Sequence, residues 1–230
     1  MTPRAKTCWL AMLVLALMLP IAAADSPPLP DGFVDLQEFI PSLRLELRYC
    51  SDKNFTGRPV AGYLKPRGIA TREAAAALKK VQDELLPFGL GVKVFDAYRP
   101  QRAVDSFVRW AENREDTLAK ARYYPDVAKR DLFREGYIAD RSSHSRGSTV
   151  DLTIIELSSG AELDMGSPFD FFGPISWPAS TLVSPSQRAN RLLLRTLMVK
   201  HGFNPYAQEW WHFTLTSEPY PATYFDFPVE

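Results

Sequence analysis

Apolar residues recur at helical spacing in three parts of the chain, each bounded by residues that start or stop helices. In the last of these parts a proline stands at the first position and Gly202 follows the end, the usual arrangement at helix termini. In the first part, Thr71 can cap the amino terminus and alanines fill the interior. The pattern predicts helices over residues 71–86, 100–114 and 185–201.

Four shorter segments have the composition of strands. Residues 43–49 alternate leucine with charged residues, which is typical of a half-buried strand, and residues 149–157 are apolar and β-branched. Residues 91–98 and 209–216 complete the set. Helices among several short strands indicate an α+β fold, here a single domain with a small antiparallel sheet flanked by helices. The order of the strands does not follow from the pattern.

Two long stretches have little periodicity. Residues 116–143 are polar, with basic and aromatic patches, so we expect irregular structure with short helices. Residues 160–184 are rich in glycine, proline, serine and phenylalanine. This second stretch is long for a connection in a compact domain, and such loops often carry function.

Composition limits the size and the partners of the protein. The chain has 230 residues, of which 46% are hydrophobic, enough for one well-cored domain. Lysine plus arginine equals aspartate plus glutamate, at 27 each, so the charge gives no reason to expect a nucleic-acid partner.

The first 24 residues have the pattern of a secretory signal peptide. Arg4 and Lys6 form the basic start, an apolar run covers residues 9–19, and small residues end at Ala24. The run is short for a membrane span, which needs about 20 residues. We therefore predict cleavage after Ala24, export to the periplasm, no stable membrane span afterwards, and a catalytic domain of residues 25–230; an uncleaved anchor is the alternative.

Two of the three histidines stand close to carboxylates in apolar surroundings. His144 and Asp151 flank a glycine, and Glu209 and His212 flank two tryptophans. A lone histidine is more often a surface or core residue, but an unpaired aspartate in an apolar strand is costly, and a divalent metal is a good partner for it. Two imidazoles and a carboxylate form a catalytic zinc set that leaves one position for water, whose proton a free carboxylate can take. The residues predict a metallohydrolase with one Zn²⁺ in a cleft, held by His144, Asp151 and His212.

The spacing of Glu209 and His212 sets a geometric condition. Residues three apart in a straight strand face opposite sides of the sheet. Glu209 must therefore lie in the turn that enters the strand, or the strand must twist.

Arg99 ends an apolar strand and precedes a proline. An arginine at a strand end is normally a surface charge, but beside a zinc site it could hold the oxyanion formed when water attacks a carbonyl. Asp96 could orient it through a bidentate pair. The residues alone leave both interpretations of Arg99 open.

Several short motifs in register resemble one family. The histidine and glutamate motifs resemble the zinc D-Ala-D-Ala peptidases, a group that also holds D,D-carboxypeptidases, and the finer match is to the VanX-type D-alanyl-D-alanine dipeptidases. The match covers nearly the whole mature chain. Its motifs are residues 48–49 (RY), 54–57 (NFTG), 62–63 (GY), 96–100 (DAYRP), 142–148 (SSHSRGS), 151–153 (DLT), 165–170 (MGSPFD), 209–212 (EWWH), 218–221 (EPYP) and 224–228 (YFDFP).

The resemblance implies roles for the matching positions. The metal-bound water would be the nucleophile, Glu209 its base, and Arg99 would stabilise the transition state. The two ends of the dipeptide would be held by Tyr49, Tyr63, Ser142 and Asp170. The Asp170 carboxylate suits the substrate ammonium, and the hydroxyls of Ser142 and Tyr63 suit its carboxylate.

We therefore expect a zinc dipeptidase that cleaves D-Ala-D-Ala into two D-alanines. Export favours salvage of wall-derived dipeptide over protection from glycopeptide antibiotics in the cytoplasm. Two alternatives remain: a zinc D,D-carboxypeptidase, which needs a cleft open on the amino side, and a zinc-dependent wall-binding protein without hydrolysis, against which Glu209 argues. Closure of the cleft is expected from the loop of residues 160–184 with Asp170.

Overall fold

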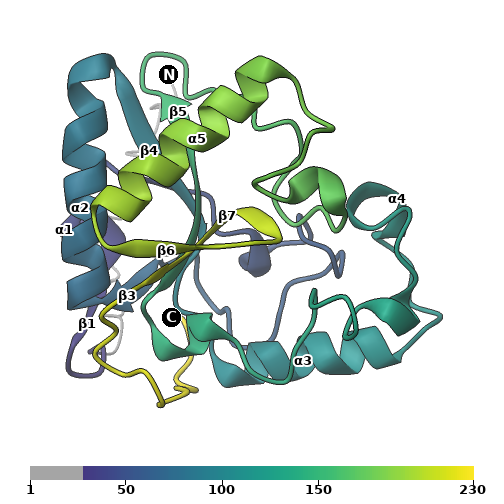
Figure 1. Cartoon of the computed structure of the whole chain (residues 1–230). Coiled ribbons are helices and arrows are strands. Elements are labelled where there is room, and N and C mark those ends of the chain that lie inside the picture. The colour runs from purple at the N-terminus through teal and green to yellow at the C-terminus, as the bar shows by residue number, and fades with distance from the viewer. Residues whose placement is uncertain (1–27) are drawn as a thin grey trace, which may run out of the picture.

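The computed structural model describes residues 28–230, so the predicted signal peptide lies outside the described residues. A five-stranded sheet crosses the molecule in the order β2-β4-β5-β7-β6 (Figure 1). The predicted α+β class with a small sheet flanked by helices is confirmed. The sheet is antiparallel as predicted except for β2, which pairs with β4 in parallel. The strands are β2 (Arg44–Leu45), β4 (Leu90–Asp96), β5 (Thr149–Glu156), β6 (Phe203–Tyr206) and β7 (Glu209–Leu215).

Helices cover the sheet on both sides. Helices α2 (Arg72–Leu85) and α5 (Pro185–Lys200) contact each other and the strands on one side, and α3 (Gln101–Glu112) lies on the other side (Figure 1). Each agrees with its prediction within two residues, and the Thr71 cap is present. The other helices and strands described are β1 (Phe33–Asp35), α1 (Leu36–Phe39), β3 (Ile69–Thr71), which pairs with β1, and α4 (Lys120–Tyr123).

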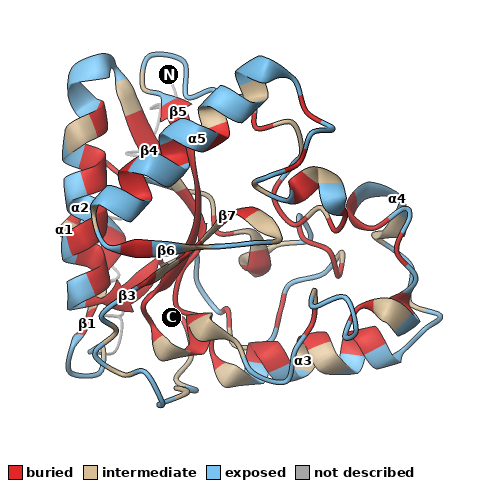
Figure 2. Ribbon diagram, viewed as in Figure 1, coloured by how far each residue is buried: buried red, intermediate tan, exposed pale blue. Residues whose placement is uncertain are grey.

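The core lies along the central strands. Every residue of β5 except Glu156 is buried, because both faces of this strand are covered. Figure 2 shows α2 and α5 buried on their inner faces and exposed on their outer faces, as expected of amphipathic helices packed on a sheet. Within residues 28–230 no helix has the length and apolar character needed to cross a membrane.

The predicted strand over residues 43–49 is largely wrong. Only Arg44 and Leu45 pair with β4, and Tyr49 lies in a 3-10 turn, Arg48–Cys50. The alternation correctly indicates which side chains are buried, since Leu43 and Tyr49 lie in the core. A segment can bury alternate side chains without pairing with another strand. The Asn54 amide instead donates to the carbonyls of Ser51 and Arg58 and folds the chain back. The turn carries Tyr49 into the core near the site.

Gly147 is the point at which the chain approaches itself most closely near the site. It ends a 3-10 turn, Ser143–Arg146, with φ 83°, and its carbonyl accepts the Thr71 N–H at 2.8 Å. A Cβ added there would overlap the Phe33 ring. Glycine therefore permits both the left-handed turn and the contact with β1 and β3.

We expect Gly147→Ala to destabilise the fold more than Gly160→Ala. Both glycines have positive φ, at 83° and 72°, but an added Cβ at Gly160 meets no atom within 4 Å. The strained conformation should cost about 1 kcal/mol or more in each variant, and the overlap with Phe33 adds to it only in the first. Urea unfolding measures both free energies. Equal losses in the two variants would show that the close approach is unimportant.

Candidate metal centre and active-site cleft

The sheet aligns three acidic and imidazole side chains in one row. Asp96 at the end of β4 pairs in register with Asp151 of β5, and Asp151 pairs with His212 of β7. Residues directly opposite on neighbouring strands project from the same face, with Cβ atoms about 5 Å apart. The ladder therefore brings Asp151 and His212 together although they are far apart in the sequence.

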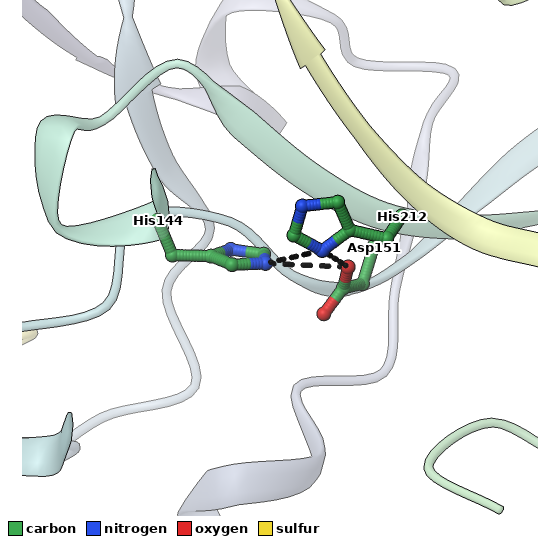
Figure 3. Close-up of side chains that lie close together, drawn as sticks. All are labelled: His144, Asp151 and His212. Carbon is green, nitrogen blue, oxygen red and sulfur yellow. Dashed lines mark hydrogen bonds and ion pairs between the residues drawn. The ribbon is translucent and has the colours of Figure 1, made fainter. Parts of the chain in front are cut away.

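His144 reaches this row from the turn before β5. Ser142 Oγ accepts the His144 N–H at 3.3 Å and caps the turn that Gly147 ends. The ring Nδ1 lies 2.7 Å from the Ala97 carbonyl, to which it must donate. Burial lowers the pKa of His144, which favours the neutral ring. Its Nε2 lone pair then faces Asp151 and His212 (Figure 3).

The three facing atoms form a nearly regular triangle. Asp151 Oδ1 lies 3.2 Å from His144 Nε2 and 3.1 Å from His212 Nδ1, and the two nitrogens are 3.3 Å apart. On the far side of its ring, His212 Nε2 lies 3.3 Å from Ser143 Oγ and can donate to it. Both rings then turn lone pairs toward a buried carboxylate oxygen that has no hydrogen-bond partner.

Such a triangle fits a tetrahedral metal. With metal–nitrogen bonds of about 2.0–2.1 Å, two ligands of a tetrahedron are separated by about 3.3–3.4 Å. Three acceptors held this close repel one another unless a cation lies between them. The donor set of His144, Asp151 and His212 could therefore hold a divalent metal, as the sequence predicts.

Glu209 lies beside the triangle. It is the first residue of β7, and its Oε2 is 3.5 Å from His212 Nδ1. The pairing of β6 with β7 jumps from Pro205–Phe213 to Tyr206–Glu209, so regular alternation is broken between Glu209 and His212. This irregularity meets the geometric condition set by their spacing. Burial raises the pKa of Glu209 to about 7, against the opposing charges of His212 and Arg99.

Arg99 lines the cleft and is not a surface charge, since only 13% of its side chain is exposed. Its Nε donates to Asp96 Oδ2 at 3.0 Å, and its Nη2 lies 3.6 Å from Asp151 Oδ2. The guanidinium also stacks over the rings of Tyr49 and Phe107, at 5.1 and 5.3 Å from their centroids. Asp96 therefore orients Arg99, as predicted, but through one hydrogen bond in place of the expected bidentate pair.

Asp170 lies in the same cleft with one unused oxygen. Tyr49 donates to its Oδ1 at 3.0 Å, while its Oδ2 is buried and has no hydrogen-bond partner. Burial and the nearby charge of Asp151 raise the pKa of Asp170 well above its usual range. A cation that entered the cleft would supply the missing partner and restore the charge of this carboxylate.

Eight of the ten predicted site residues line one cleft of about 390 Å³, a volume suited to a small ligand. The other two lie behind it: the Tyr63 hydroxyl donates to Asp96 Oδ1 at 2.7 Å, beneath Arg99. A direct contact between Tyr63 and the substrate carboxylate therefore stays a prediction. The eight lining residues are Tyr49, Arg99, Ser142, His144, Asp151, Asp170, Glu209 and His212.

Two further residues of the cleft were not singled out from the sequence. Ser143 meets the outer nitrogen of His212, and the Tyr206 ring lies 5.4 Å from the His212 ring. Ser143 adjoins His144 in the histidine motif, and a hydroxyl next to a metal ligand is a common hydrogen-bond partner for a ligating histidine. The position of Tyr206 depends on the hairpin between β6 and β7, and no local pattern signals it.

Comparison with known families agrees with this geometry. The model of the D-Ala-D-Ala dipeptidase family matches residues 30–230. The chain belongs to this family. It is accordingly a metallopeptidase, and the resemblance seen in the short motifs is confirmed.

Relatives of the D-Ala-D-Ala dipeptidase family match along almost their whole length. The D-alanyl-D-alanine dipeptidase of Streptomyces coelicolor is 46% identical over 198 residues, covering 86% of this chain and 97% of the relative. That of Enterococcus faecalis is 44% identical, covering 86% and 98%, and that of Escherichia coli is 34% identical, covering 83% and 86%. A solved structure of a mutant of the D,D-pentapeptidase VanY in complex with Zn(II) overlaps only weakly, with TM-score 0.41, 16% identity, and coverage of 67% of this chain and 77% of that one.

Metal binding should depend on the triangle and not on Glu209. After chelation, added Zn²⁺ should raise the melting temperature of the wild type and of Glu209→Ala, since binding to the folded state stabilises it by about 2.7 kcal/mol at a hundredfold excess over Kd. His212→Ala removes one of three donors and should lose this response. His201→Ala is the matched control, because His201 contacts Glu84 away from the cleft. A full response in His212→Ala would contradict the assigned site.

Proposed function

We propose that this protein is a zinc-dependent dipeptidase that hydrolyses D-alanyl-D-alanine to two D-alanines. The observation that carries the proposal is the unpartnered Asp170 oxygen in the same cleft as the metal-ligand triangle and Glu209. A cation site beside a hydrolytic site suits a substrate whose ammonium group lies one residue from the scissile bond. The names of the relatives support the same substrate.

His144, Asp151 and His212 would hold one Zn²⁺. When bound, the metal polarises the scissile carbonyl and lowers the pKa of water toward about 7. Both histidines are fixed on their outer nitrogens, by the Ala97 carbonyl and by Ser143, so no rearrangement is needed to present their lone pairs.

Glu209 acts as the general base. It takes a proton from the attacking water and later delivers it to the leaving amine. Burial raises the pKa of Glu209, and a base whose pKa lies near the working pH is the most effective in both transfers. Arg99 steadies the oxyanion that forms on the scissile carbonyl, and loss of one such donor typically lowers the rate by about a hundredfold or more.

The two ends of the dipeptide have separate partners. Asp170 accepts the substrate ammonium through its free oxygen, while Tyr49 holds the other oxygen in place. Ser142, at the opposite turn, offers a hydroxyl to the substrate carboxylate. Tyr63 assists from behind by holding Asp96, and its predicted contact with the carboxylate belongs to the same proposal.

The closed position of Asp170 favours a dipeptidase over a D,D-carboxypeptidase. Asp170 is only 4% exposed, and residues on both sides of it are packed into the core. A longer peptide would have to pass the point where the dipeptide ends, leaving buried polar groups unpaired. Glu209 beside the ligands argues against a wall-binding protein without hydrolysis.

The decisive measurement is amine release by the zinc-loaded protein. D-Ala-D-Ala should be hydrolysed, whereas a pentapeptide ending in D-Ala-D-Ala should not. Glu209→Ala should keep its zinc and lose about 10²–10⁴-fold in kcat, the usual contribution of a general base. Glu112→Ala, an exposed glutamate on α3, is the matched control and should keep full activity.

Each other outcome selects a different function. Comparable hydrolysis of the pentapeptide would establish the carboxypeptidase. No hydrolysis of either peptide by zinc-loaded protein would favour the binding protein. An active Glu209→Ala enzyme would show that another group is the base.

We also infer that the protein is exported, because residues 1–24 have the signal-peptide pattern. Salvage of wall-derived dipeptide outside the cytoplasm would then be its purpose. Mass spectrometry of the protein from a Gram-negative host should find Asp25 at its amino terminus, in the periplasmic fraction. An intact Met1 in the cytoplasmic fraction would refute both export and the salvage role.

A further inference from the structure

A buried arginine lies behind the loop that carries Asp170. Arg191 is on the inner face of α5 and is 4% exposed. Its hydrogen bonds in the described part of the chain go to carbonyl and hydroxyl oxygens, and none goes to a carboxylate. Burial accordingly lowers the pKa of Arg191 to about 10, although Asp164 opposes the shift. A buried charge without a counter-ion is costly, so its retention calls for a specific reason.

The guanidinium joins the two ends of the loop. Nε donates to the Met165 carbonyl at 2.6 Å, Nη1 to the Trp177 carbonyl at 2.9 Å, and Nη2 to the Ile175 carbonyl at 2.9 Å. These carbonyls lie five residues before Asp170 and five and seven residues after it. Arg191 thus closes the neck of a compact loop, residues 165–177, whose middle bears Asp170.

Two serines extend this contact to the tip of the loop. Ser167 Oγ lies 3.4 Å from Arg191 Nη2 and 2.9 Å from Ser176 Oγ. Ser176 donates in turn to the carbonyl of Phe171 at 2.6 Å, directly after Asp170. The guanidinium is therefore connected to the carbonyl of the residue after Asp170 through partly buried hydrogen bonds.

The same network reaches the strand that bears Glu209. The indole of Trp210 donates to Ser167 Oγ at 3.0 Å. Ser167 therefore links the loop that carries Asp170 to β7, the strand that begins with Glu209.

Asp170 needs such support. Its φ of 63° is the one positive φ at a non-glycine residue within residues 28–230. A backbone of this kind costs of order 1–3 kcal/mol and persists only where the surroundings determine it. Phe169 packs against Phe95 and Phe172 packs against Phe55, so the chain is anchored in the core on either side of Asp170.

We propose that Arg191 is a positioning residue, which fixes Asp170 in the orientation that receives the substrate ammonium. This inference rests on the proposed function. Arginine is required because its planar fork donates in three directions at once, whereas a lysine ammonium on a flexible stem cannot reach all of these acceptors.

The test compares Arg191→Lys with Arg195→Lys, an exposed arginine one turn further along α5. Arg191→Lys should raise KM for D-Ala-D-Ala by about tenfold or more, the scale of one lost charge-assisted hydrogen bond, while kcat changes less than about threefold and zinc content is unchanged. Arg195→Lys should match the wild type. Ser176→Ala, which removes the donor to the Phe171 carbonyl and the contact with Ser167 Oγ, should raise KM in the same direction and serves if Arg191→Lys fails to fold.

A double-mutant cycle separates positioning from a general loss of structure. In an Asp170→Asn background, Arg191→Lys should add little to KM, because both changes act on the same contact. Additive effects, or a fall in kcat and zinc content with unchanged KM, would overturn the proposal while leaving the dipeptidase intact. A zinc-loaded wild type that does not hydrolyse D-Ala-D-Ala would overturn both.

Discussion

The convergence of one carboxylate oxygen and two imidazole nitrogens inside the sheet is the constraint on which the rest of the structure depends. Asp151 lies in a strand that is buried on both faces, where a charge without a partner is strongly disfavoured. The ladder supplies His212 directly opposite, and the turn ended by Gly147 supplies His144. The close approach of that turn to β1 and β3 is thus a consequence of where the third ligand must be.

The carboxyl groups of the cleft bear on the two cations of the proposed function. Asp96, Asp151, Asp170 and Glu209 lie in or beside the cleft, and Arg99 pairs with the first two. Burial raises the pKa of both Asp170 and Glu209, as expected where counter-charge is lacking. A divalent metal at the triangle and an ammonium at Asp170, as proposed, would each supply the missing counter-charge. Binding of the first cation would weaken the attraction for the second, so the geometry of each partner must supply selectivity.

The sequence predicts those site residues whose chemistry is indicated by their neighbours in the chain. Asp151 in an apolar strand and His144 before a glycine turn signal their chemistry within a few residues. The prediction was wrong where pairing depends on distant segments: the leucine alternation before Tyr49 reflects burial, while the Asn54 amide bends the chain away from the sheet. Arg191 gave no signal, because an arginine on a helix becomes buried only when a loop 14–26 residues earlier wraps around it.

In the proposed function, the division between sheet and loop would separate the chemistry from substrate choice. The metal ligands and Glu209 lie in the paired strands or next to them. A shift of one residue in strand register would turn every side chain of the strand to the opposite face of the sheet. Asp170 instead belongs to a loop held by hydrogen bonds to its own backbone carbonyls, and these do not depend on the identity of most loop residues. Because Trp210 of β7 donates to Ser167 of the loop, the loop is tied to the strand that begins with Glu209. In the proposed function, this contact would hold the substrate ammonium at a constant distance from Glu209.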